Sequence, residues 1–199
     1  MANVSKPCGL KPLKSITGAP YNGQCRVYYR GTGDANAIYV GDPVALGGSA
    51  DTNGVPDVVK WSSGAMVGAV VGVLPVYPGV SLVASSLDLT DRHLSASTAG
   101  YLLVCDDPEM LFEIQDGFTV AASAAEIGLN CDFALAAGGA NYSDSGTTTG
   151  TTAATTTASL PLKLMGLVQK ENNAFGTYAK LLVKINNHQL GGGTGSTGV

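Results

Sequence analysis

Few side chains in this chain have the types and spacing that catalysis or metal binding requires. The two histidines, His93 and His188, are far apart, and neither belongs to a His-x-Glu or His-x₃-His pair that could hold zinc. No Gly-x-Ser-x-Gly elbow is present for a serine nucleophile. The glycine-rich segment 191–198 lacks the lysine of a phosphate-binding loop. The sequence therefore predicts a protein that is not an enzyme and needs no cofactor.

An acidic group is the strongest remaining candidate for chemistry. Asp106, Asp107 and Glu109 stand around a proline and could ligate Ca²⁺ or act as paired acids. The string DTNG at residues 51–54 is similar to the start of a calcium loop but lacks the later ligands. Turn chemistry explains both groups, because Asp favours the opening position of a turn and Asn-Gly is a hairpin dipeptide. We therefore predict two turns, with the three acidic side chains exposed, and no metal site.

The cysteines also lack a reactive arrangement. Cys8, Cys25, Cys105 and Cys131 form no Cys-x-x-Cys pair, and in a protein made in the cytosol they are expected to be buried free thiols. A bridge between Cys8 and Cys25, formed after release from a cell, is the alternative.

These side chains belong to a chain whose composition favours β-structure. Its 199 residues suffice for one sizeable core, only 13% of them are charged, and glycine occurs 27 times. Short apolar runs alternate with turn residues along most of the chain. The prediction is an all-β fold: a single-domain β-barrel or β-sandwich of about eight to ten short strands over residues 23–190. The Ser123–Glu126 capping box, closely followed by Gly128, allows at most one short helix.

Three segments show the strand patterns most clearly. Residues 101–105 and 110–115 flank the acidic turn and are predicted to form a hairpin with Phe112 and Ile114 in the core. Residues 177–189 alternate in the same way. The run AMVGAVVGVLPV, residues 65–76, is predicted to be a buried strand whose glycines allow bending or close backbone approach.

Two segments have loop composition. Residues 138–157 are rich in threonine, glycine and alanine and are expected to form a surface loop that feeds a strand. Residues 191–199 are expected to be a flexible glycine-rich tail. The low-charge segment 138–154 and the glycine-rich segment 64–75 are also candidates for self-association, because small uncharged side chains let two backbones approach at little desolvation cost.

The net charge of −4 hides an asymmetry between the start of the chain and the rest. No acidic residue precedes Asp34, and the basic residues before it are Lys6, Lys11, Lys14, Arg26 and Arg30. Residues 1–22 are therefore predicted to be an extended basic arm that lies on a negatively charged surface beyond its own domain. An arm folded back on its own acidic body is the alternative. Nucleic acid is not expected as the partner, because the charges are few and no aromatic residues interleave with them.

Membrane insertion is not expected either. The longest apolar run, residues 65–74, holds two glycines and is about half the ~20 residues of a membrane span. The first residues lack the apolar region of a signal peptide. These features predict a soluble protein made in the cytosol.

Seven strings occur in one order along the chain: APYNGQ, AIYVGDPVAL, VGAVVGV, YLLVCDDPEMLFEIQ, IGLNCD, LKLMGLVQKENN and LLVKINNHQL. Together they resemble a family of head decoration, or cement, proteins of tailed bacteriophages. The likeness extends from about Ala19 to Leu190, which is nearly the whole chain. Single strings such as GDPV carry little weight, whereas the ordered set is specific.

The resemblance implies a compact β-rich subunit that binds the outside of an assembled capsid shell and reinforces contacts between neighbouring capsid subunits. The implied partners are the phage major capsid protein and further copies of this chain, as a homodimer or homotrimer. The implied location is the capsid exterior of the virion, after assembly in the host cytoplasm. The family has no catalytic residues. The candidates for capsid contact are Lys6, Lys11, Lys14, Arg26 and Arg30.

Two other classes of protein are weighed against this one. A glycan-binding β-sandwich of a phage head or tail fibre would bind a host-surface glycan with exposed aromatic residues, and Tyr77, Tyr142 and Trp61 are the candidates. A small hydrolase would need a site around Asp106, Asp107 and His93.

Overall fold

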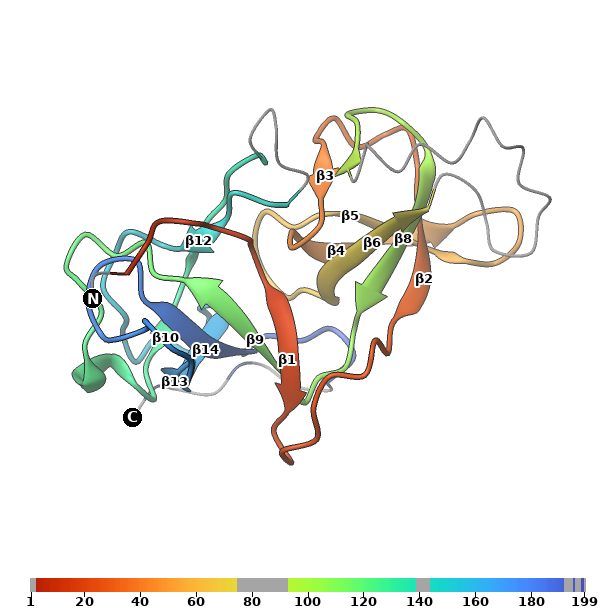
Figure 1. Ribbon diagram of the computed structural model, residues 1–199. Coiled ribbons are helices and arrows are strands. Elements are labelled where there is room, and N and C mark those ends of the chain that lie inside the picture. The colour runs from red at the N-terminus through yellow and green to blue at the C-terminus, as the bar shows by residue number, and fades with distance from the viewer. Residues whose placement is uncertain (1–2, 75–92, 139–143, 192–194, 196–197, 199) are drawn as a thin grey trace.

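The computed structural model describes residues 3–74, 93–138, 144–191, 195 and 198, and almost every regular element in them is a β-strand (Figure 1). The all-β prediction is confirmed. The helical element within these residues is one 3₁₀ turn, η2 (Ala124–Glu126), which begins at the predicted capping box: the Ser123 amide donates to Glu126 Oε2 over 2.6 Å. The strands are β1 Lys11–Ser15, β2 Arg26–Arg30, β3 Ile38–Tyr39, β4 Pro43–Ala50, β5 Pro56–Lys60, β6 Gly68–Leu74, β7 His93–Leu94, β8 Gly100–Cys105, β9 Met110–Gln115, β10 Asn130–Cys131, β11 Phe133–Ala134, β12 Thr148–Thr149, β13 Leu162–Leu167 and β14 Lys180–Ile185.

The middle of the chain forms a closed barrel with the strand order β2-β5-β4-β6-β8. Its interior holds the side chains that alternate inward along these strands, among them Tyr28, Val44, Val58 and Leu102. Gly68 of β6 faces the carbonyl of Cys105 so closely that a Cβ atom there would overlap it, which confirms the close backbone approach predicted for this strand. Residues 66–70 of segment 64–75 are buried in the barrel wall and its approach, so only Gly64, Ala65 and the half-buried residues 71–74 remain as candidates for self-association among the described residues.

The turn predicted at residues 51–54 is confirmed as the connection between the antiparallel strands β4 and β5. Gly54 has φ +80°, and one oxygen of the Asp51 carboxylate accepts hydrogen bonds from the Asn53 and Val55 amides, each of 2.8 Å. The other oxygen accepts the hydroxyl of Tyr101 over 2.6 Å. Both Asp51 oxygens therefore serve the turn and its attachment to β8.

Both ends of the chain build the second unit, a five-stranded sheet with the order β1-β9-β14-β13-β10 (left half of Figure 1). Its inner face carries Phe112, Ile114, Leu162, Leu181 and further apolar side chains, which pack on the barrel residues Trp61, Met66 and Cys105 in one core. The alternation predicted for residues 177–189 is confirmed in β14, whose inner positions are buried. Although β14 is last in the chain, it lies between β9 and β13.

The predicted hairpin of residues 101–115 is wrong. Strand β8 pairs with β2 and β6 in the barrel, whereas β9 pairs with β1 and β14 in the sheet. The acidic link between them forms the predicted turn, in which the Met110 amide donates to the Asp107 carbonyl oxygen over 3.1 Å. The link is less solvated than predicted, because Asp106 is held against β2: it accepts the Tyr28 hydroxyl over 2.7 Å and pairs with Arg26 over 3.2 Å. The Asp106 side chain is only 12% exposed, and Asp107 is half-buried; the exposure predicted for Glu109 is confirmed.

The N-terminal segment is folded onto its own body, so the prediction of an arm reaching beyond the domain is corrected over the described residues. Lys11–Ser15 form β1 at the side of β9, and Leu10 is 1% exposed in the core. The strand was not recognised because Lys-Pro-Leu-Lys-Ser shows little alternation, and its backbone pairing is supplied by residues about a hundred positions away. Deletion of residues 1–17 would therefore remove a strand and a core residue together.

The threonine-rich segment is also different from the predicted surface loop. Ser145, Thr147 and Thr149 are fully buried, and β12 pairs with β11. The hydroxyl groups satisfy buried partners: Ser145 Oγ donates to Asp42 Oδ1, and Thr149 Oγ1 accepts the Gly117 amide over 2.9 Å. Threonine is a strand former whose hydroxyl can replace a lost backbone partner, so its abundance did not indicate a loop here. Residues 151–157 are mostly exposed.

The cysteines agree with the free-thiol prediction. All four are free, with Cys105 and Cys131 buried and Cys8 and Cys25 half-buried. In the described part of the chain, no helix has the length and apolar character needed to cross a membrane.

The core position predicted for Phe112 is confirmed, with a side chain that is 0% exposed, and it leads to a stability prediction. Phe112→Ala should lower the free energy of unfolding by about 3–5 kcal/mol, because the lost ring leaves a cavity between the sheet and the barrel. Urea denaturation followed by circular dichroism measures this. Exposed Ile16, at the end of β1, supplies the control: Ile16→Ala should change the stability by less than about 0.5 kcal/mol. An equal effect of both changes would contradict the assignment of the core.

Candidate functional site

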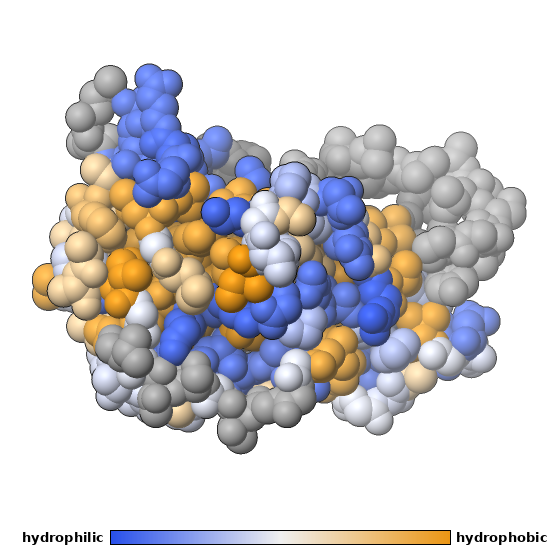
Figure 2. All heavy atoms as spheres, turned by 90° about the horizontal axis from the view of Figure 1, so that it is seen from below, coloured by the Kyte–Doolittle hydropathy of each residue, from blue (hydrophilic) through white to orange (hydrophobic). Residues whose placement is uncertain are grey.

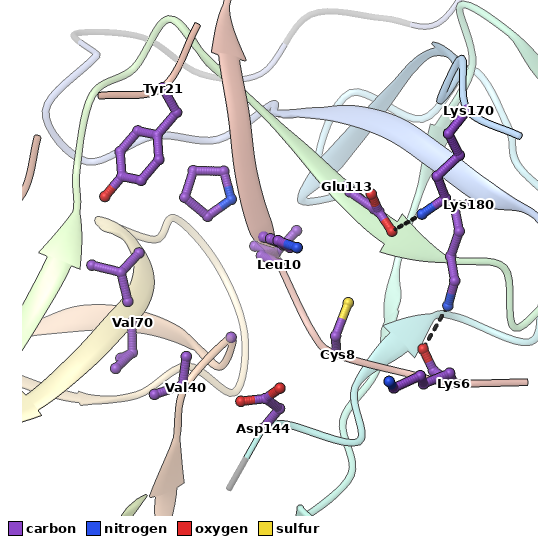
Figure 3. Close-up of a pocket in the computed structure, with 14 residues that line it drawn as sticks. Lys6, Cys8, Leu10, Tyr21, Val40, Val70, Glu113, Asp144, Lys170 and Lys180 are labelled. Atoms are coloured by element: carbon purple, nitrogen blue, oxygen red, sulfur yellow. Dashed lines mark hydrogen bonds and ion pairs between the residues drawn. The ribbon is translucent and has the colours of Figure 1, made fainter. Parts of the chain in front are cut away.

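A groove of about 560 Å³ lies where the N-terminal segment crosses between the barrel and the five-stranded sheet (Figure 3). We call it the N-terminal groove. Its two sides differ in chemistry. The side toward the barrel is mostly apolar, with Tyr21, Val40 and Val70 beside the carboxylate of Asp144, whereas the side toward the sheet carries charged groups of β9, β14 and the N-terminal segment.

The charged side is held in place by short hydrogen bonds. Lys170 Nζ lies 2.5 Å from Glu113 Oε1. Lys180 Nζ donates to the carbonyl oxygen of Lys6 over 2.5 Å and to Gln115 Oε1 over 2.7 Å. The same Gln115 oxygen accepts the Lys6 amide over 2.6 Å. The sheet therefore fixes the N-terminal segment along the groove, and burial lowers the pKa of Lys180, with Lys170 and Lys6 adding to the effect and Cys8 and Glu113 opposing it.

The groove is suited to binding rather than to nucleophilic chemistry. Burial raises the pKa of the Cys8 thiol, so its thiolate, which is the reactive form, is disfavoured. Glu113 is 7% exposed and already paired with Lys170. What the groove presents to a partner is an apolar wall beside several ammonium groups, together with the Asp144 carboxylate. Such a surface fits a protein segment that carries both apolar and acidic side chains.

The structure separates the five basic residues that the sequence singled out. Lys6 and Lys11 line the N-terminal groove, and Lys14 is exposed on the neighbouring part of β1. Arg26 lies on the barrel, where its side chain is 64% exposed beside Asp106. Arg30 is 0% exposed and cannot contact a partner, so its assignment as a capsid-contact candidate is corrected.

Arg30 instead holds two loops together inside the molecule. Its Nη1 donates to the carbonyl oxygens of Ser95 and Thr98 over 2.7 and 2.6 Å. Its Nη2 donates to the carbonyl oxygens of Asp34 and Asn36 over 2.6 and 2.5 Å. Charge alone placed this residue on the surface in the sequence prediction, whereas the two Nη atoms of its planar guanidinium donate to four backbone carbonyl groups of the two loops.

A second buried polar cluster was missed from the sequence. The Asp42 carboxylate is fully buried, pairs with Lys60 Nζ over 2.8 Å and accepts the Tyr39 amide over 3.0 Å and the Ser145 hydroxyl. Lys60 is the neighbour of Val44 in the β4–β5 register, which brings its ammonium group to Asp42. The string Gly-Asp-Pro signals a turn, so the sequence offered no reason to expect a buried ion pair at this point.

The arrangement required for the hydrolase alternative is not formed. His93 stacks on Tyr39, with ring centroids 4.9 Å apart, and the next residue, Leu94, contacts Gly100 at the start of β8. Asp106 follows the other end of β8, and a six-residue strand is roughly 20 Å long. The histidine and the acidic residues are therefore at opposite ends of one strand. Within the described ranges, no group of three or more His, Cys, Asp or Glu residues could hold a metal ion.

The other histidine gives a pH prediction. His188 is 6% exposed, and burial lowers its pKa below the ordinary value of 6.5, with Lys184 acting in the same direction and Asp106 and Asp107 opposing it. As the pH falls below 6.5, the unfolded chain binds a proton more readily than the folded one, so this contribution to stability is complete above 6.5 and is lost below it. His188→Gln, in which the amide oxygen can still accept the Leu190 amide that now bonds to Nδ1 over 3.1 Å, should reduce that loss.

Urea denaturation of both proteins at a series of pH values tests the prediction. The two stability curves should differ in slope below pH 6.5 and run parallel above it. Parallel curves over the whole range would show that His188 has the same pKa in the folded and unfolded chains.

The glycan-binding alternative loses one of its three aromatic candidates. Trp61 is 5% exposed, donates its Nε1 to the carbonyl oxygen of Gly64 over 3.0 Å and packs edge-on against Phe133. Tyr77 and Tyr142 lie outside the described residues. The exposed aromatic side chains that the structure does place are Phe175 and Tyr178, which the sequence analysis did not select.

In comparisons with known proteins, no family model, no curated protein and no solved structure matches this chain.

Proposed function

We propose that this protein is a structural virion protein that binds the exterior of an assembled phage capsid and reinforces contacts between neighbouring major capsid protein subunits. Two independent arguments support the proposal. The first is the ordered set of strings that resembles the head decoration proteins. The second, which carries it, is the N-terminal groove: a rigid surface of apolar and cationic groups that offers binding but no assembled nucleophile.

The fold suits this role physically. The barrel is closed, and the five-stranded sheet has its β10 edge covered by Thr155, whose amide and carbonyl both bond to Asn130 over 2.8 and 2.7 Å. At the barrel and at this edge of the sheet, a partner would therefore meet side chains rather than free backbone groups. On a shell with many copies, contacts of modest strength suffice because they act in parallel.

Surfaces for a second copy of the chain are also available. Val4, Val120, Phe175 and Tyr178 are between 40% and 75% exposed. Asn3 bonds to the carbonyl oxygens of Ala174 and Thr177, and Ala122 forms a bridge with Gly176, so these apolar side chains come from neighbouring segments. Seen from below, hydrophobic residues gather over the half of the molecule that contains the five-stranded sheet (Figure 2). We propose homodimer or homotrimer formation through this end.

Purified virions and capsids test the function. The protein should be present at a copy number near that of the major capsid protein, and added protein should co-sediment with undecorated capsids and raise their resistance to heat. Presence in only tens of copies would favour a fibre component instead. Absence from virions together with failure to bind capsids would refute the proposal.

A further inference from the structure

The outer face of the five-stranded sheet collects most of the positive charge of the protein. Strand register places Lys11 and Lys14 of β1 opposite Glu113 and Leu111 of β9, and all four side chains point away from the core residues Phe112 and Ile114. In the same way Lys180 and Lys184 of β14 alternate with the core residues Leu181, Val183 and Ile185. Lys163 of β13 lies between Leu162 and Leu164, which both face the core.

Two more lysines join these five through their hydrogen bonds. Lys170 pairs with Glu113, and the Lys6 backbone is bonded to Lys180 and Gln115. The resulting surface, which we call the lysine face, contains Lys6, Lys11, Lys14, Lys163, Lys170, Lys180 and Lys184. It holds seven of the 11 basic residues in a chain of net charge −4. Its acidic side chains are Glu109 and Glu113, and Asp144 also lines the N-terminal groove, so these ten residues carry +4.

The lysine face is not flat. The N-terminal groove opens at one side of it, and a second groove of about 340 Å³ lies where β13 and β14 run together. Lys163 and Lys184 line the second groove, and Ile16, Pro108 and Met165 supply apolar surface between the charges. Figure 3 shows the first groove with the same combination of apolar and ammonium groups. Acidic and apolar side chains of one segment could therefore occupy each groove.

The charges on this face are costly for the isolated molecule. Lys163 and Lys184 are directly opposite each other in the antiparallel register, and like charges in such pairs destabilise a sheet. Glu109 lies 2.9 Å from Lys184 and relieves only part of this repulsion, because its own side chain is 52% exposed. A partner that supplies carboxylates would add opposite charge beside this pair.

We infer that the lysine face is a docking surface for an acidic segment of a partner protein. The inference rests on the proposed function for the identity of that partner, the outer surface of the capsid shell. A protein segment fits better than a nucleic acid, because both grooves have apolar walls beside their ammonium groups.

Charge variants on the face and a matched variant off it test the inference. The double variant Lys14→Glu/Lys163→Glu changes two side chains that lie on the lysine face, and Lys14→Gln/Lys163→Gln removes the same charges without reversing them. Arg26→Gln removes a positive charge from the barrel, outside the lysine face. The Arg26 side chain is 64% exposed. Thermal unfolding confirms that each variant is folded before binding is measured.

Binding to capsids and to poly-L-glutamate is then measured at low and high salt. The Glu double variant should bind both at least about tenfold more weakly at low salt, and the Gln variant should be intermediate. Arg26→Gln should weaken binding much less than either double variant, because Arg26 lies on the barrel and is paired with Asp106. High salt should reduce the differences, because screening weakens exposed charge pairs.

The outcomes separate the two proposals. Lysine-dependent binding to poly-L-glutamate without binding to capsids would refute the proposed function and support the docking surface. Capsid binding that is equal in all variants would overturn the docking surface and leave the function standing. Preference for duplex DNA over poly-L-glutamate, or no binding to either poly-L-glutamate or capsids, would also overturn the inference.

Discussion

Replacement of Arg30 by alanine is expected to lower the free energy of unfolding by about 3–5 kcal/mol, a large share of the stability of a typical domain. The guanidinium is 0% exposed and donates to four carbonyl oxygens, on Asp34, Asn36, Ser95 and Thr98. Asn36, Ser95 and Thr98 are exposed residues, so water can bond to part of the carbonyl oxygens left behind, and only an acceptor that stays out of reach of water costs the full ~1–3 kcal/mol. The loops before β3 and after β7 would lose the group that joins them.

Arg26 provides the control, because it lies at the other end of the same strand and is exposed. Arg26→Ala should change the stability by less than about 1 kcal/mol. Arg30→Lys should be intermediate, since one ammonium group cannot reach four acceptors in the planar arrangement that the guanidinium satisfies. Urea denaturation measures the stability, and hydrogen exchange of residues 95–99 reports the local loss. An Arg30→Ala protein as stable as the natural one would show that water replaces the guanidinium without cost.

Gly41→Ala is expected to have an effect of similar size, about 5 kcal/mol, through a different mechanism. Gly41 has φ +94° and lies against the backbone of the N-terminal segment, where a Cβ atom would overlap the carbonyl oxygen of Cys8. In return, Gly9 has φ +64° and would overlap the carbonyl of Gly41. The Leu10 amide donates to the Gly41 carbonyl over 2.8 Å, and the Gly41 amide donates to Val70 over 2.7 Å. A methyl group would break this junction of the barrel and the N-terminal segment.

Gly23→Ala is the control that separates the effect of the steric overlap at Gly41 from the effect of placing alanine in a left-handed backbone conformation. Gly23 has a similar φ of +90°, and nothing lies within 4 Å of the position of a Cβ atom. Its replacement should cost only about 1–2 kcal/mol, the price of a left-handed conformation for an L-residue. If both alanine variants lose the same stability, the contact between Gly9 and Gly41 contributes nothing. Thermal unfolding and urea denaturation of both variants decide this.

Local patterns in the sequence predicted elements well, and they failed to predict partners. The Asn53-Gly54 turn, the 3₁₀ turn after Ser123 and the alternation of β14 depend on neighbouring residues, and all are confirmed. The pairing of β9 with β1 and β14 depends on contacts between distant segments. The run from Tyr101 to Gln115 has the pattern of a hairpin. Alternation of apolar and polar residues identifies the two strands, but it does not show which sheet each strand joins.

Only part of the lysine face could be predicted from the sequence, for the same reason. Lys6, Lys11 and Lys14 were noticed because no acidic residue is near them in the sequence. Lys163, Lys170, Lys180 and Lys184 lie in the last fifth of the chain, and only the strand order brings them to the same face. Arg30 shows the opposite failure, since a charge selected for its position in the sequence is buried by its position in the fold.

The central place of β14 in its sheet sets an order of events during synthesis. All five barrel strands lie between Arg26 and Cys105, so the barrel has its complete set of strands while the second half of the chain is still being made. The five-stranded sheet cannot be completed until residues 180–185 have been synthesised, because β9 and β13 each have a free edge until β14 is inserted between them. During that interval the nascent chain has two open strand edges, which are the places where association with other chains begins. A premature stop before Lys180 would make the interval permanent and leave a folded barrel attached to an aggregation-prone half sheet.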